Sequence, residues 1–104
     1  MTLMQFVSWN CRGLGSKPKE EAIKYIVKMN SPEILLIQET KMKEPETIQA
    51  SKKFWKKGDG RAVSARGASG GLATFWNSSK LDLLEDFSNT HWLFTKFLHR
   101  DSGL

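Results

Sequence analysis

The chain has 104 residues, which suffices for one domain with a modest hydrophobic core. Its hydrophobic content of 39% and charged content of 26% are typical of a globular chain, and no apolar run approaches the ~20 residues that cross a bilayer, so we expect no membrane partner. The net charge of +5 favours polyanionic partners, and the basic excess lies in residues 1–60, which hold eleven of the sixteen Lys and Arg and seven of the eleven Asp and Glu.

The amino terminus does not have the features of a secretory signal. Its first ten residues, MTLMQFVSWN, show no basic start and no small-residue cleavage site. The only cysteine, Cys11, has no disulfide partner within the chain, which is typical of a reducing compartment. We therefore expect an intracellular protein, nuclear or cytoplasmic and not secreted, in which Cys11 is a small buried residue and not a nucleophile.

The first predicted elements are a strand and a helix. Apolar and aromatic residues from Leu3 to Trp9 predict the strand, which runs into a turn with two glycines. Ser16 is a favourable cap for a helix that begins near Lys17, and Asn30 and Pro32 end it. The apolar side chains of this helix recur every three or four residues between lysines, and so predict one packed face: Ala22, Ile23, Ile26 and Val27.

A second strand follows from Glu33 to Thr40 (EILLIQET), and its unbroken apolar run predicts burial on both faces in the middle of a sheet. Strand, helix and strand in this order make a βαβ unit, in which the two strands are parallel. Asn10 and Glu39 are therefore expected to face each other at the carboxyl edge of the sheet, where α/β proteins bind ligands. The alternative for Glu39 is a helix cap or an ion pair with Lys41 or Lys43.

The second part of the chain predicts a short helix and an antiparallel meander. The helix begins at Glu44 and is broken by KKGDG at Lys56 to Gly60. Four strands with a period of two then follow: Ala62–Arg66, Gly71–Trp76, Leu81–Phe87 and His91–Leu98. The tryptophans have the spacing of core residues and not of a base-stacking platform: Trp9, Trp55, Trp76 and Trp92. Residues 99–104 are typical of the turn of a further hairpin, for which no partner strand follows.

Three motifs carry a resemblance to a known family. WNCRGLG at 9–15, LLIQET at 35–40 and SGGLATFW at 69–76 resemble the first three motifs of the endonuclease/exonuclease/phosphatase superfamily, with the closest likeness to the endonuclease domain of plant LINE-type (non-LTR) retrotransposons. The resemblance implies an α/β fold in which residues 1–104 are the amino-terminal half of one four-layered α/β sandwich, with the βαβ unit followed by the meander. It also implies a hydrolase that nicks DNA and depends on Mg²⁺, with Mn²⁺ as an alternative.

The same resemblance implies roles for two residues at the sheet edge. Glu39 corresponds to the family's metal-binding glutamate, and Mg²⁺ prefers hard oxygen ligands of this kind. Asn10 corresponds to the asparagine of the first strand, which contacts the scissile phosphate or helps to place the metal. The alternative for Asn10 is an Asx turn that ends the strand. Both residues are thus candidate catalytic and metal-binding residues.

Two arginines are candidate DNA-binding residues. Arg12 stands where the repair enzymes of the superfamily have an acidic residue, so a carboxylate for the metal waters is absent and a guanidinium can hold a phosphate instead. Arg66 precedes the GASGG loop, where relatives approach the DNA backbone. The alternative for both arginines is a solvated turn or strand-end residue. With so few phosphate contacts, we expect DNA binding to be weak and independent of sequence.

Two further motifs of the family are missing. Asp-x-Asn, which orients or deprotonates the attacking water, and Ser-Asp-His both lie in the second half of such a domain, and neither occurs here. His91 and His99 cannot replace the missing histidine, and we expect them in a strand and a turn. The full domain would be a hydrolase, whereas this chain is expected to be inactive alone and to self-associate through an exposed sheet edge. The alternatives are a non-catalytic nucleic-acid-binding or structural module, and a fragment of an exonuclease or phosphoesterase of the superfamily.

Overall fold

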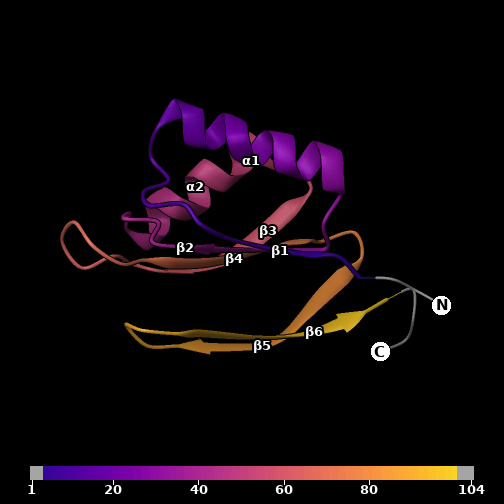
Figure 1. Ribbon diagram of the computed structural model, residues 1–104. Helices are drawn as coiled ribbons and strands as arrows, with labels where there is room; N and C mark the ends of the chain where they lie inside the picture. Colours follow the sequence, from indigo (N-terminus) through magenta and orange to yellow (C-terminus); the bar gives the residue numbers. More distant parts are fainter. Residues whose placement is uncertain (1–3, 101–104) are drawn as a thin grey trace.

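The computed structural model describes residues 4–100, which form a mixed α/β fold in three layers (Figure 1). This confirms the predicted fold class. In chain order, the elements are β1 Phe6–Asn10, α1 Lys17–Asn30, β2 Ile34–Gln38, α2 Glu44–Phe54, β3 Gly58–Val63, β4 Leu72–Asn77, β5 Leu81–Ser88 and β6 Leu93–His99. The predicted start of the first strand at Leu3, and residues 101–104 of the predicted last turn, lie outside the described residues.

The first sheet has four strands in the order β1-β2-β4-β3. β1 and β2 are parallel and joined by α1, which confirms the βαβ unit, and β4 pairs antiparallel with both β2 and β3. Both helices cover one face of this sheet (Figure 1). The fully buried side chains of the core include Leu14, Ile23, Leu35, Ile37 and Phe75. β2 therefore lies in the interior of the sheet, as its apolar sequence predicts.

Helix α1 begins and ends where its sequence predicts. The Ser16 hydroxyl accepts a hydrogen bond from the Lys19 amide at 3.4 Å, which satisfies one of the unpaired amides at the helix start. Pro18 lies in the first turn, where no amide donor is needed. At the other end, Ser31 takes a left-handed conformation with φ 44°, and its amide donates to the Val27 carbonyl. These caps fix α1 as the crossover between β1 and β2.

The second sheet is the hairpin of β5 and β6, which lies on the face of the first sheet opposite the helices (Figure 1). The Trp76 ring of β4 contacts the Phe97 ring of β6, with 5.0 Å between the ring centroids. Arg61 of β3 pairs with Asp86 of β5 at 3.5 Å. The predicted antiparallel strands are therefore present, and the last two of them form a separate sheet that packs against β4 and β3.

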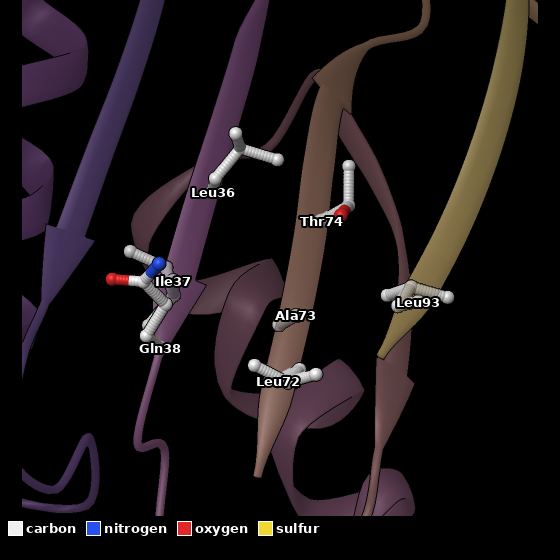
Figure 2. Close-up of a pocket in the computed structure, with 7 residues that line it drawn as sticks. All are labelled: Leu36, Ile37, Gln38, Leu72, Ala73, Thr74 and Leu93. Atoms are coloured by element: carbon white, nitrogen blue, oxygen red, sulfur yellow. The ribbon is translucent and has the colours of Figure 1, made fainter. Parts of the chain in front are cut away.

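This arrangement leaves β2 open on the hairpin side. Leu36 is 37% exposed, although its neighbours Leu35 and Ile37 are buried on the helix side. A groove of about 160 Å³ lies here, lined by side chains of β2 and β4 and by Leu93 at the start of β6 (Figure 2). The prediction that β2 is buried on both faces is therefore wrong, because the hairpin packs against the other half of the sheet.

Strand β3 begins at Gly58, four residues before its predicted start at Ala62, so that KKGDG is partly strand. The sequence predicts only that these residues break the preceding helix. Gly60 instead lies against the Phe75 ring of the neighbouring strand, and a Cβ at this position would stand 2.4 Å from the Cδ1 atom of that ring. The glycine therefore makes room for an aromatic side chain within the sheet.

The two histidines and one tryptophan also differ from expectation. His91 is exposed in the turn between β5 and β6, and His99 is buried at the end of β6, so their predicted strand and turn roles are reversed. Trp92 is 48% exposed, whereas Trp55 and Trp76 are buried as predicted. Trp92 lies beside the turn of a two-stranded hairpin, where no described element covers it.

Candidate functional site

The carboxyl ends of β1 and β2 meet at one edge of the first sheet, as their parallel pairing requires. Asn10 and Gln38 are partners in the register, so Glu39 follows directly beside the end of β1. Hydrogen bonds continue past the strands, because the Cys11 amide donates to the Gln38 carbonyl at 3.1 Å and the Gly13 amide donates to the Glu39 carbonyl at 2.8 Å. The backbone thus brings Asn10 and Glu39, predicted from two separate motifs, to the same edge.

The backbone at this edge is strained. Arg12, Glu39 and Lys41 all have positive φ angles, of 52°, 55° and 56°. Such left-handed conformations cost a non-glycine residue roughly 1–3 kcal/mol, and they gather at functional sites where the surrounding structure enforces them. Each of the two parallel strands is therefore followed by a sharp turn that carries a charged side chain, the exposed Arg12 and the half-buried Glu39.

The loop between β3 and β4 forms hydrogen bonds with the turn that carries Glu39. The Thr40 amide donates to the Gly71 carbonyl at 3.2 Å, and the Lys41 amide donates to the Gly70 carbonyl at 2.8 Å. Gly71 has a φ of 92°, and a Cβ at this position would lie 2.1 Å from the Thr40 hydroxyl oxygen. Glycine alone fits this contact. The glycine pair before β4, which belongs to the third sequence motif, therefore holds the turn that carries Glu39.

The Glu39 carboxylate has neither of the structural partners that its sequence position offers. Within residues 4–100 it accepts no hydrogen bond and forms no ion pair, either with Lys41 or with Lys43. It does not cap α2 either, because the capping residue is Lys43 and the first helical amide, of Glu44, donates to the Ser64 hydroxyl at 2.8 Å. Both carboxylate oxygens are thus available to an external ligand.

The Asn10 side chain is in the same situation. It is exposed at the end of β1, and the Asx turn that the sequence allows would require a hydrogen bond from a following amide to its Oδ1 atom. The described part of the chain contains no such bond. Asn10 therefore offers one hard oxygen and one NH₂ donor group to a ligand at the edge.

Lys19 is a basic residue at this edge that the sequence does not single out. Its ammonium group donates to the Cys11 carbonyl and lies 5.4 Å from the centroid of the Trp9 ring. Burial raises the pKa of the Cys11 thiol, and the nearby Lys19 charge acts against this rise. Cys11 is 1% exposed, which confirms the prediction of a small buried residue.

The two candidate arginines lie on different loops. Arg12 follows Asn10 by two residues and shares its edge. Arg66 lies in the loop between β3 and β4, where its amide donates to the Ser69 carbonyl at 2.9 Å and the Ser69 amide donates to the Arg66 carbonyl at 3.2 Å. This loop contacts the Glu39 turn through Gly70. The structure therefore gathers Asn10, Arg12 and Glu39 and sets Arg66 across the glycine loop from them.

The donor set suits a hydrated metal ion and not a protein cage. Among residues 4–100 there is no group of three or more His, Cys, Asp and Glu side chains that could hold a metal. Mg²⁺ typically keeps several waters and needs only one or two carboxylates from the protein. Glu39, with Asn10 beside it, fits such a partial site.

Fold and edge together define an α/β protein with two packed sheets and a polar site where β1 and β2 end. The sequence model described as the endonuclease/exonuclease/phosphatase family matches residues 7–100, and the chain therefore belongs to this family. Comparison with curated proteins finds no match. No helix within the described residues is long and apolar enough to cross a membrane.

Solved structures show the same fold. The mannosyl-6-phosphatase of Bacteroides thetaiotaomicron is 17% identical with a TM-score of 0.74, over 97% of this chain and 48% of that one. The 3′ phosphatase NExo from Neisseria, bound to a product DNA hairpin, is 17% identical with a TM-score of 0.67, over 84% and 31%. An AP endonuclease from Leishmania major is 21% identical with a TM-score of 0.61, over 73% and 24%. The chain thus spans less than half of each of these three structures.

Proposed function

We propose that the chain supplies the metal-binding edge of a Mg²⁺-dependent phosphodiester hydrolase that acts on DNA. The observation that carries this proposal is the Glu39 carboxylate, which has no structural partner among the described residues and is held on a strained turn beside Asn10. Membership of a family that generally depends on a divalent metal supports it, as does a similar structure whose name records a bound product DNA hairpin. The three sequence motifs favour the retrotransposon endonuclease type, and a nuclear or cytoplasmic location would follow from that function.

The roles of the edge residues follow from their chemistry. Glu39 would hold the metal, with the Asn10 oxygen or water beside it. When bound, Mg²⁺ would act as a Lewis acid toward a phosphoryl oxygen. If the Asn10 oxygen is not a ligand, its NH₂ group can donate to a non-bridging phosphate oxygen. The exposed Arg12 guanidinium can bind a phosphate with two parallel hydrogen bonds.

The chain alone lacks the group that would activate water. A general base contributes roughly 10²- to 10⁴-fold to such reactions, and uncatalysed phosphoester cleavage is very slow. Neither Asp-x-Asn nor Ser-Asp-His occurs in the sequence. We therefore expect no measurable nicking of supercoiled plasmid by residues 1–104 with Mg²⁺. Nicking that disappears in Glu39→Ala would contradict this expectation and require a base within the chain.

A second candidate is a phosphatase that acts on a small substrate. The likeness to the mannosyl-6-phosphatase favours it, because that structure is matched over more of both chains than the 3′ phosphatase and the AP endonuclease are. A non-catalytic nucleic-acid-binding module is a further alternative, which the net charge of +5 supports. Duplex DNA binding separates the small-substrate phosphatase from the two candidates that bind nucleic acid. For contacts to two or three phosphates, log affinity should fall with log salt concentration at about −0.9 per phosphate, whatever the sequence.

Metal binding tests the proposal directly. Paramagnetic Mn²⁺ should broaden the amide signals of Asn10–Gly13 and Gln38–Lys41, and Glu39→Ala should abolish this broadening while leaving the fold intact. Glu46→Ala is the matched control, because Glu46 is an exposed carboxylate in the first turn of α2, outside the loop that carries Glu39. Equal broadening in Glu39→Ala and the unmodified chain would show that Glu39 does not bind the metal.

We also propose that the chain self-associates through its exposed sheet edges. β1 is an edge strand of the first sheet, and its Phe6 is 59% exposed. β6 pairs with β5 on one side alone within the described fold. Unpaired strand edges next to apolar side chains favour association. Sedimentation should show species larger than a monomer that increase with concentration, and a monomer at all concentrations would refute this.

A further inference from the structure

A pocket lies between two loops that join strands of different sheets. One loop joins β3 to β4 and carries Arg66, and the other is the turn between β5 and β6, which carries His91. Figure 1 shows both at the same end of the molecule. Together they enclose a cavity of about 180 Å³, lined by Ser64, Arg66, Ser69, Thr90 and His91 and by the two glycines before β4.

The lining of this pocket has the chemistry of an oxyanion site. It contains one guanidinium, one imidazole and three hydroxyl groups, and no carboxylate. By contrast, the cavity between α2 and β3 has Glu44 and Asp59 beside Arg61. The Arg66 guanidinium forms no hydrogen bond and no ion pair with any residue from 4 to 100. A guanidinium among hydroxyl groups, without a neutralising acid, is suited to a phosphate.

Both walls of the pocket are ordered before any ligand binds. In the β5–β6 turn, the Asn89 side-chain oxygen accepts from the His91 amide at 2.8 Å and from the Trp92 amide at 3.0 Å. In the other loop, Arg66 and Ser69 exchange two backbone hydrogen bonds. A ligand therefore meets a site whose backbone needs little further ordering, which lowers the entropic cost of binding.

The Ser64 hydroxyl of the pocket can donate a hydrogen bond to a ligand. The Ser64 oxygen accepts from the Glu44 amide at 2.8 Å, and this contact leaves its proton available for an acceptor such as a phosphate oxygen. Ser64 also ties the pocket to the start of α2, at the end of the loop that carries Glu39. The pocket and the candidate metal edge are thus parts of one connected structure.

The glycine loop is the wall that the pocket and the Glu39 turn have in common. Gly70 and Gly71 line the pocket, and their carbonyls accept from the amides of Lys41 and Thr40 at 2.8 and 3.2 Å. A phosphate in the pocket would therefore stand next to the edge at which Glu39 lies. Two neighbouring phosphate sites suit a polynucleotide, which carries successive phosphates, whereas a small phosphomonoester needs only one.

We propose that this pocket binds a backbone phosphate of the nucleic acid that flanks the phosphate at Glu39. The inference rests on the proposed function for its substrate class. It adds His91, Ser64 and Thr90 to the substrate-binding residues, and it gives Arg66 a defined place among them. The pocket thereby assigns the β5–β6 turn, which belongs to the second sheet, a part in substrate binding.

The test follows amide signals of the isotope-labelled chain during titration with inorganic phosphate and with single-stranded oligothymidine, both without metal. Both probes should shift the signals of Gly70, Gly71, Thr90 and His91. Arg66→Ala should weaken oligothymidine binding about tenfold, the usual effect of losing a charge-assisted contact, and Arg66→Lys should retain part of the affinity. His91→Ala should weaken binding less, because an imidazole offers a phosphate fewer hydrogen-bond donors than a guanidinium does.

Lys53→Ala is the matched control. Lys53 is exposed near the end of α2, so this variant removes one positive charge away from the pocket and should change affinity by less than about twofold. Arg66 and His91 are exposed as well, and their variants should keep the amide spectrum of the folded chain. Equal losses in Arg66→Ala and Lys53→Ala would overturn the inference, because binding would then depend on net charge alone.

The remaining outcomes separate this inference from the proposed function. Shifts confined to Arg12 and its neighbours would refute the pocket and leave the Glu39 site untouched. Phosphate and oligothymidine binding in the pocket, in a chain that shows no Mn²⁺ broadening at Glu39, would uphold the pocket and refute the metal site. Shifts with inorganic phosphate but none with oligothymidine would refute the assignment to a polynucleotide.

Discussion

The two sheets of this protein differ in how firmly they are held. The first has two interior strands, a helical layer over one face and a continuous hydrogen-bonded edge beyond β1 and β2. The second is a hairpin attached by a few side chains, such as Phe97 against Trp76 and Asp86 with Arg61. Its outer side carries an exposed aromatic cluster of Phe87, Trp92 and Phe94.

The two sheets therefore contribute to two different proposed sites. The candidate metal-binding residues lie on the firmly held sheet, where a strained backbone can be maintained because many contacts enforce it. The hairpin contributes one wall of the pocket proposed to bind phosphate, through a turn with its own internal hydrogen bonds, although few side chains attach the hairpin to the first sheet. Local opening should therefore cost less in the hairpin than in the first sheet.

The largest expected effect comes from breaking the first sheet at its edge. Gly71→Ala places a Cβ 2.1 Å from the Thr40 hydroxyl and forces alanine to a φ of 92°, so we expect a loss of about 3 kcal/mol or more in the free energy of unfolding. Gly70→Ala is the control, since Gly70 has a similar φ of 78° and open space around it, and should cost about 1 kcal/mol. Urea unfolding measures both, and equal losses would show that the Thr40 contact does not hold the edge.

A smaller effect should come from detaching the hairpin. Phe97→Ala removes the half-buried ring that packs on Trp76, at a cost of about 2 kcal/mol, less than for a fully buried ring. Hydrogen exchange should speed up in β5 and β6 and stay unchanged in β1, β2 and β4. Phe94→Ala is the control, because Phe94 is 42% exposed and stacks on Phe87 within the hairpin. Uniformly faster exchange in Phe97→Ala would mean that the two sheets open together.

The smallest effect is a pH dependence at the base of the hairpin. Arg100 donates to the Asp82 carboxylate at 2.6 and 3.0 Å, and these hydrogen bonds lower the pKa of Asp82 below its ordinary value of 3.8. A lowered pKa means that the contact stabilises the folded chain above pH 3.8 and that this contribution is lost as the pH falls through the folded-state pKa. Carboxyl NMR titration should show the lowered pKa in the unmodified chain and an ordinary one in Arg100→Met. Identical titration curves would rule out the contact.

The βαβ unit and its edge could be predicted because their signals are local. Ser16 caps α1, the apolar run around Leu35 identifies an interior strand, and parallel pairing then brings Asn10 and Glu39 together. The sequence shows the glycine pair before β4 as part of a motif, but it does not show why glycine is needed there. Only the folded chain shows that Gly71 lies against Thr40.

The missed features depend on contacts between distant segments. A register shift between Leu83 and Glu85 reverses the faces of the side chains in the last part of β5, so that Phe87 lies on the opposite face from Leu81 and Leu83. The alternation of residues in the sequence cannot reveal this shift. Lys19 looks like a solvated helix residue until the turn after β1 brings the Cys11 carbonyl to it. His91 became a candidate binding residue only because the hairpin turn meets the Arg66 loop.

The position of β2 between β1 and β4 has a consequence for synthesis on the ribosome. Gln38 pairs with Asn10, which is made before it, and with Leu72, which is made well after it. Synthesis proceeds at about 5–20 residues per second, so the edge of β2 that pairs with β4 stays unpaired for on the order of a few seconds. During that interval an apolar strand with an unpaired edge is exposed to other nascent chains and to chaperones. The yield of folded protein should therefore depend on which partner reaches that edge first.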